Sequence, residues 1–144
     1  MPIILDAKWG DIDNTNNGYV EMAFDYLGVD AITVHPYMGQ KSLQLFLDRA
    51  DKGIFVLCRT SNPGAGEFQD EMYLKVAKHV ATWGENCGLV VGATAPEEMR
   101  EIRNLVGDMT FLVPGIGQQG GSIEDIMKAG GRHMVINSSR AIIF

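Results

Sequence analysis

Six short apolar segments recur along the chain about 26 residues apart, and helical patterns lie between them. The segments begin near residues 3, 31, 54, 88, 110 and 133. Because each segment is apolar on both faces, they predict the strands of a parallel sheet that helices cover. A length of 144 residues fits one domain, so we expect residues 1–144 to form a single unit of alternating strands and helices.

The helices between these strands are indicated by apolar spacing and by residues that typically begin or end a helix. We expect helices at residues 14–26, 42–51, 68–83 and 94–105, and a shorter helix that begins at Ser122. The fourth helix has the clearest start, because Thr94 can cap it and Pro96 suits its first turn.

Two architectures satisfy this strand and helix pattern: an open doubly wound sheet and a (β/α)₈ barrel. Periodicity and composition do not separate them. A full barrel needs eight units and about 200 residues or more, whereas this chain supplies six units. A barrel built from this chain is therefore an incomplete one of about six βα units.

The composition argues against several classes of function. A net charge of −6 without a basic stripe argues against nucleic-acid binding. No apolar run is long enough to span a bilayer, and no basic and then apolar leader opens the chain. The two cysteines, Cys58 and Cys87, do not make a disulfide framework. We therefore expect a cytoplasmic protein with no nucleic-acid or membrane partner.

Polar and unusual residues gather directly after the strands. The main groups are Asp6, Lys8 and Asp11 after the first strand, Arg59 and Ser61 after the third, residues 114–121 after the fifth, and Ser139 and Arg140 after the sixth. In either parallel architecture the carboxyl ends of the strands meet on one face, which carries the functional site. This asymmetry predicts an enzyme or a descendant of one.

Asp6, Lys8 and Asp11 form the densest charged group in the sequence. On an extended segment the side chains of Asp6 and Lys8 share a face, because side-chain direction repeats every two residues. A lysine held between carboxylates stays protonated and can deliver a proton to a developing carbanion. The alternative is a solvated ion pair at the end of a strand.

A glycine-rich segment at residues 115–121 precedes the last predicted helix and resembles a phosphate-binding loop. Glycine lets backbone N–H groups approach an anion. The chain is rich in this residue, because 17 of its 144 residues are glycine, against a usual share of about 7%. Arg140 would complete such a site as a bidentate donor. The alternatives are a flexible connection and a surface arginine.

Four segments in order resemble the signature of the orotidine 5′-monophosphate decarboxylase family. They are Asp6-x-Lys8-x-x-Asp11-Ile12 with Thr15, the loop from Arg59 to Ala65 (RTSNPGA), the loop from Val113 to Gly121 (VPGIGQQGG), and the run from Val135 to Ile143 that contains Arg140. The resemblance covers the chain from Ile4 to Ile143.

This resemblance implies a (β/α)₈ barrel that works as a homodimer, without a cofactor or a metal, on a nucleotide monophosphate. The implied reaction is loss of CO₂ from orotidine monophosphate to give uridine monophosphate in pyrimidine biosynthesis. Asp6 would crowd the substrate carboxylate and Lys8 would protonate C6. Asp11 and Thr15 would reach the neighbouring subunit's site.

The same resemblance implies that the other site residues bind the two ends of the nucleotide. Ser61 would contact the pyrimidine, Pro114 would lie in the phosphate-gripping loop, and Gln119 and Arg140 would hold the phosphate.

Two alternatives remain at this point. A sugar-phosphate decarboxylase group shares the Asp-x-Lys-x-x-Asp core and uses Mg²⁺, although the Ser61 loop and Gln119 favour the orotidine enzyme. The family's second lysine and ribose-binding aspartate would precede Met1. Without this half of the charged array, we expect turnover to be very low or absent. The other alternative is thus a truncated, non-catalytic barrel fragment that self-associates through unpaired strand edges.

Overall fold

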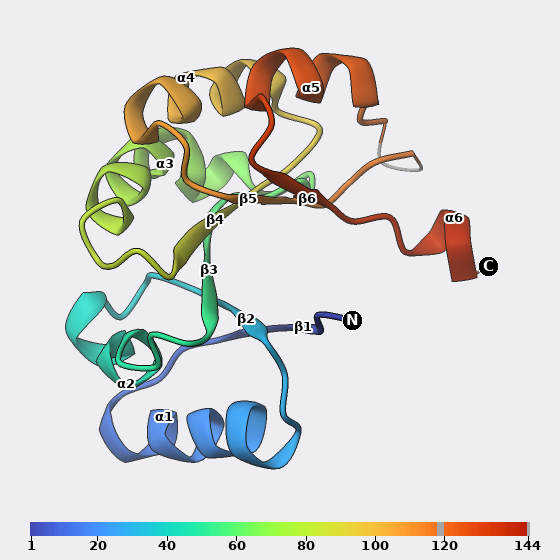
Figure 1. Cartoon of the computed structure of the whole chain (residues 1–144). Coiled ribbons are helices and arrows are strands. Elements are labelled where there is room, and N and C mark those ends of the chain that lie inside the picture. The colour runs from blue at the N-terminus through green and yellow to red at the C-terminus, as the bar shows by residue number, and fades with distance from the viewer. Residues whose placement is uncertain (118–119, 144) are drawn as a thin grey trace.

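The computed structural model describes residues 1–117 and 120–143, and the side chains of all of these except Arg140 and Ala141. The strands are β1 (Ile4–Trp9), β2 (Ala31–Val34), β3 (Gly53–Arg59), β4 (Cys87–Val91), β5 (Phe111–Val113) and β6 (Met134–Ile136) (Figure 1). The α-helices are α1 (Asp13–Val20), α2 (Gln44–Leu47), α3 (Gly66–Val80), α4 (Pro96–Val106), α5 (Ile123–Gly130) and α6 (Arg140–Ile143).

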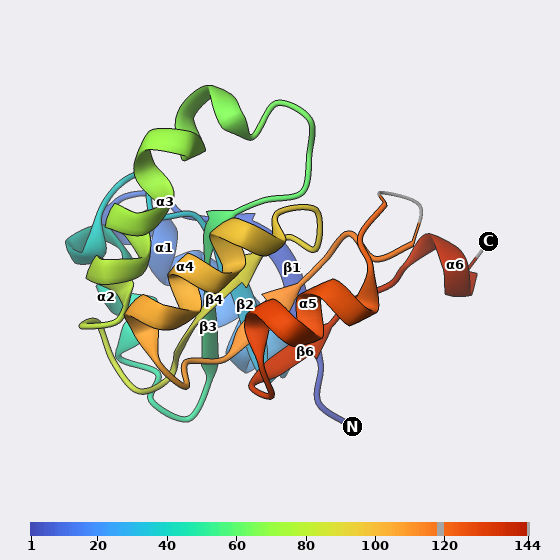
Figure 2. The ribbon, with the colours of Figure 1, turned by 90° about the horizontal axis from the view of Figure 1, so that it is seen from above.

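The strands form one sheet in chain order, from β1 to β6, and every neighbouring pair is parallel. The sheet curls, and helices α1 to α5 lie around its outer side (Figures 1 and 2). A doubly wound sheet would reverse its strand order at one point. The doubly wound alternative is therefore wrong, and the chain forms an incomplete β/α barrel, as the six-unit barrel prediction required.

The core lies on both sides of this curled sheet. The larger part fills the space between strands and helices and includes fully buried Ile32, Leu89 and Phe111. The smaller part lies on the inner side of the sheet, where Phe55, Val90 and neighbouring residues meet. Strands that are buried on both faces explain why the sequence shows continuous apolar runs instead of alternation.

Several predicted boundaries differ from the structure. The first strand extends to Trp9, so Asp6 and Lys8 lie within it and do not follow it. The helix expected at residues 14–26 is α-helical only to Val20 and continues as a π-helical segment, Glu21–Tyr26. The helix expected at residues 42–51 is reduced to a 3₁₀ segment, Gln40–Leu43, and one turn of α2.

The predicted starts of two helices also have different outcomes. Thr94 does not cap α4, because the residue at that position is Ala95, which makes no side-chain cap. Ser122 does cap α5, and its hydroxyl accepts the Asp125 N–H at 3.4 Å. In the part of the chain that the structure describes, no helix is long and apolar enough to cross a membrane.

Candidate active site

A cleft of about 510 Å³ opens at the carboxyl ends of the strands. Four predicted site residues line it together: Asp6, Lys8, Ser61 and Pro114. They come from β1 and from the segments after β3 and β5, which the parallel curled sheet brings to one end of the barrel. This is the end at which β/α barrels carry their sites.

The Asp6 and Lys8 side chains form an ion pair within the cleft. The Lys8 ammonium nitrogen lies 2.6 Å from Asp6 Oδ2, and the two side chains are 51% (Asp6) and 50% (Lys8) exposed. The ion pair holds both side chains on the same side of β1, although the pairing of this stretch of the strand is irregular. A fixed ammonium group beside a carboxylate, open to a cleft, can supply a proton to a bound molecule.

Thr33 on β2 is a neighbour of this pair that sequence reasoning missed. Its hydroxyl accepts the Lys8 N–H at 2.9 Å and donates to Asp6 Oδ1 at 2.8 Å. The only signal in the sequence is a polar residue within the apolar run Ala31–Val34. That signal is weak, because threonine is common in strands.

Asp11 and Thr15 lie outside the cleft, at the beginning of α1. The Asp11 carboxylate accepts the Ile12 N–H at 2.8 Å, and Thr15 is exposed in the first turn of the helix. The fully buried Asn16 holds this segment, because its amide accepts the Asp11 N–H at 2.9 Å and donates to the Asp11 carbonyl at 2.6 Å. The structure therefore joins Lys8 to Asp6 in the cleft, whereas Asp11 does not line it.

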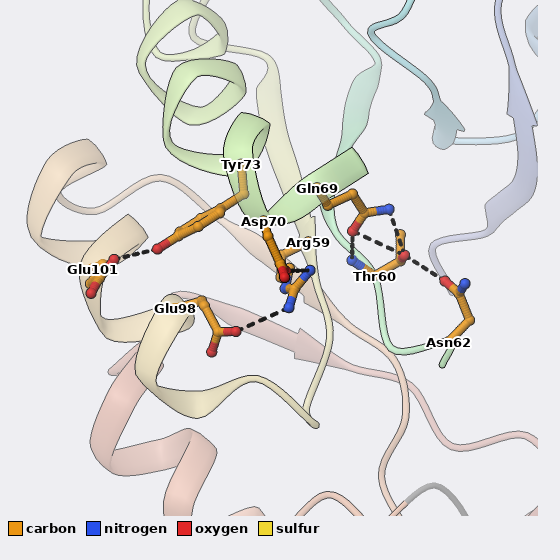
Figure 3. Close-up of polar contacts among 8 residues, drawn as sticks. All are labelled: Arg59, Thr60, Asn62, Gln69, Asp70, Tyr73, Glu98 and Glu101. Carbon is orange, nitrogen blue, oxygen red and sulfur yellow. Dashed lines mark hydrogen bonds and ion pairs between the residues drawn. The ribbon is translucent and has the colours of Figure 1, made fainter. Parts of the chain in front are cut away.

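The loop that carries Ser61 is held by the side chain of Gln69 on α3 (Figure 3). The Gln69 amide accepts the Thr60 N–H at 2.7 Å and donates to the Thr60 hydroxyl at 2.8 Å. That hydroxyl donates to the Asn62 side chain at 2.6 Å. On the other side of the loop, a Cβ added to Gly92 would lie 2.8 Å from the Ser61 backbone nitrogen. Only glycine therefore allows the residue that follows β4 to approach Ser61 so closely.

Arg59 was expected among the residues of the site face, but it points toward the helices instead (Figure 3). Its guanidinium lies 2.8 Å from Asp70 on α3 and 3.1 Å from Glu98 on α4. The reason is a register shift between Leu57 and Arg59, which turns the last residue of β3 to the outer side of the sheet. Arg59 thus joins β3 to α3 and α4.

Tyr73 and Glu101 form a hydrogen bond between α3 and α4 that should make stability depend on alkaline pH (Figure 3). The hydrogen bond to Glu101 and, to a smaller extent, burial raise the pKa of Tyr73 to about 12. The folded state therefore favours the protonated phenol, and this contribution is fully present below the ordinary pKa of about 10. We expect it to disappear between pH 10 and 12. Denaturant unfolding across this range should show a steeper loss of stability for the wild type than for Tyr73→Phe, and equal slopes would contradict the assignment.

The glycine-rich segment at residues 115–121 follows β5 and reaches the cleft through Pro114, Gly115 and Ile116. Gly115, Gly117 and Gly120 have φ angles of 96°, 82° and 88°, which favour glycine. Gln119, the predicted phosphate ligand, lies outside the described residues, and the Arg140 side chain is not described. Residues 137–139, directly before Arg140, line the cleft.

A second and more open groove, of about 960 Å³, lies on the outer side between α3 and α4. It is remote from the strand ends, and the predicted site residues do not line it. The described residues include no group of three or more His, Cys, Asp or Glu side chains that could hold a metal ion. The cleft at the strand ends is therefore the candidate active site.

The curled parallel sheet and the charged cleft at its carboxyl end define a β/α-barrel protein with an enzyme-like site. The sequence profile of the Orotidine 5'-phosphate decarboxylase / HUMPS family matches residues 1–144. The chain belongs to this family, which confirms the resemblance that the four segments indicated.

Known relatives agree with this assignment. An orotidine 5'-phosphate decarboxylase of Herpetosiphon aurantiacus is 50% identical over 154 residues, and the match covers 100% of this chain and 58% of the relative. The Leishmania donovani UMP synthase structure has a TM-score of 0.94 at 44% identity, covering 97% of this chain and 34% of that one. The structure of the Methanocaldococcus jannaschii orotidine 5'-monophosphate decarboxylase, complexed with inhibitor BMP, has a TM-score of 0.88 at 29% identity. The match covers 98% of this chain and 65% of that one. The chain thus spans a little over half the length of the curated relatives it matches.

Proposed function

We propose that this chain carries the reaction site of an orotidine 5′-phosphate decarboxylase, which converts orotidine monophosphate to uridine monophosphate and CO₂. The observation that carries the proposal is the Asp6–Lys8 ion pair in the cleft at the strand ends. The family match and the names of the relatives support the same reaction.

The proposed chemistry needs only a carboxylate and a proton donor at the reacting carbon. The Asp6 carboxylate lies beside the substrate carboxylate and disfavours its charge. The C6–carboxylate bond breaks, its electron pair stays on C6, and CO₂ leaves. The Lys8 ammonium then gives its proton to C6 to form uridine monophosphate. No cofactor or metal takes part in this scheme.

Ser61, Pro114, Gln119 and Arg140 are the proposed nucleotide-binding residues. Ser61 and Pro114 both line the cleft, which supports a role for each in holding the nucleotide. The three residues before Arg140 also line the cleft, which supports a place for Arg140 near it. Binding energy from a phosphate remote from the breaking bond can help to lower the barrier.

We further propose that the protein is a cytoplasmic homodimer in which Asp11 and Thr15 serve the neighbouring subunit's site. Both residues lie outside the cleft of their own chain, and Ile12, next to Asp11, is an exposed apolar residue. Two buried free cysteines, Cys58 and Cys87, suit a reducing compartment.

Calorimetric titration with uridine monophosphate tests the proposed binding site. We expect binding that weakens at least about tenfold in Arg140→Ala, because a charge-assisted hydrogen bond to phosphate is lost. Uridine, which has no phosphate, should bind the wild type at least as weakly as uridine monophosphate binds the variant, because it loses the contacts of Gln119 and of the glycine-rich loop as well. Arg132→Ala is the matched control, since this arginine is exposed just before β6, at the opposite end of the strand.

Three results would count against the proposal: no binding by the wild type, equal affinity for uridine and its monophosphate, or equal losses in the two arginine variants. A non-catalytic fragment that self-associates would show the first of these, together with large species in sedimentation.

A further inference from the structure

Thr33 closes a ring of contacts around the Asp6–Lys8 pair. This side chain is fully buried, and its oxygen lies 2.9 Å from the Lys8 backbone nitrogen and 2.8 Å from Asp6 Oδ1. The Lys8 ammonium nitrogen lies 2.6 Å from the other oxygen of the same carboxylate. One hydroxyl on β2 therefore contacts the backbone of the lysine and the side chain of the aspartate.

The strand pairing around Thr33 is irregular in a way that places both charged side chains. Leu5 pairs with Ile32 and Trp9 pairs with Val34, so three residues of β1 face the single residue Thr33 of β2. The extra residues form a bulge, a feature that often redirects side chains near active sites. Asp6 and Lys8 are the two polar members of this bulge.

The backbone of Lys8 adopts an unfavourable conformation within the bulge. Its φ angle is 54°, a left-handed value that residues other than glycine and asparagine seldom adopt. Such a conformation persists only where surrounding contacts hold it, and it concentrates at functional sites. The hydrogen bond from the Lys8 N–H to Thr33 is a contact of this kind.

We propose that Thr33 is a positioning residue that fixes the Asp6–Lys8 pair for catalysis, an inference that rests on the proposed decarboxylase function. The hydroxyl accepts a hydrogen bond from the Lys8 N–H and donates one to the Asp6 carboxylate. The backbone of the proton donor and the carboxylate that orients it are thereby held relative to each other. Valine has the shape of threonine but can make neither contact.

The test compares Thr33→Val with Thr33→Ser, which keeps the hydroxyl. Thr33→Val should lower kcat for CO₂ release at least about tenfold, because small displacements of catalytic groups cost rate steeply. The dissociation constant for uridine monophosphate should stay within about threefold, since Thr33 is buried beneath the pair and binds no ligand itself. Thr33→Ser should retain kcat within about threefold.

Two further measurements separate positioning from a general loss of stability. Thr82→Val is the matched control, because the Thr82 hydroxyl bonds the His79 carbonyl on an exposed helix end away from the cleft. All rates are measured well below the unfolding midpoint of each variant. Amide exchange at Lys8 should be about tenfold faster in Thr33→Val, because its acceptor is lost, and unchanged in Thr82→Val.

The outcomes separate this inference from the proposed function. An active wild type with unchanged kcat in Thr33→Val would overturn the positioning role and leave the function standing. A wild type that neither binds uridine monophosphate nor releases CO₂ would overturn the function. Exchange at Lys8 then decides whether Thr33 holds the pair: faster exchange in Thr33→Val supports it, and unchanged exchange rejects it.

Discussion

Replacing Arg103 with methionine should destabilise the fold by at least about 3 kcal/mol, because one side chain joins four backbone carbonyls. The Arg103 guanidinium donates to Gly130, Gly107, Met109 and His133, with distances of 2.7 Å to Gly130 and Met109 and 3.1 Å to His133. These carbonyls lie at the ends of α4 and α5 and at the segments that lead into β5 and β6. Methionine keeps much of the apolar stem but supplies no donor.

The guanidinium of Arg103 also stacks on the Phe111 ring, with 3.7 Å between Cζ and the ring centroid. Burial lowers the pKa of Arg103, yet the group stays charged at neutral pH. Arg100→Met is the matched control, because Arg100 is exposed on the same helix. Thermal unfolding followed by circular dichroism should show a midpoint about 10 °C lower for Arg103→Met and little change for Arg100→Met. Similar midpoints in both variants would show that these contacts contribute nothing to stability.

The arrangement of the fold could be predicted from the sequence because it depends on short-range patterns. Apolar runs with helical segments between them define six strand–helix units, and a parallel sheet then places every strand end on one face. This logic correctly brought Asp6, Lys8, Ser61 and Pro114 into one cleft. The sequence pattern left the strand order open, and the structure decided for the barrel.

The contacts that support the site could not be predicted, because they join residues far apart along the chain through ordinary polar side chains. Thr33 lies 27 residues from Asp6, and Arg103 reaches backbone carbonyls, which leave no mark in the sequence. The register shift that turns Arg59 outward likewise depends on the pairing of β3 with β4. Local patterns predict which face carries chemistry, whereas long-range hydrogen bonds decide how its side chains are held.

The largest effect on activity is expected from Lys8→Met, on the proposed function. Methionine has a similar length but no proton to give, so CO₂ release should fall by about 10²- to 10⁴-fold, the usual contribution of a positioned acid. Uridine monophosphate carries no carboxylate at C6. Its affinity should therefore change little, although Asp6 loses its partner at 2.6 Å. A loss in kcat without a loss in product binding identifies an interaction made during the reaction.

Lys41→Met provides the control for Lys8→Met, because Lys41 is exposed in the 3₁₀ segment before α2 and does not line the cleft. Single-turnover CO₂ release and calorimetric binding of uridine monophosphate, measured on the same preparations, separate chemistry from binding. Lys8→Met that retained turnover would exclude Lys8 as the proton donor. Lys8→Met that lost both turnover and binding would instead make Lys8 a binding residue, because a cation that only donates a proton to C6 is not needed to hold the product.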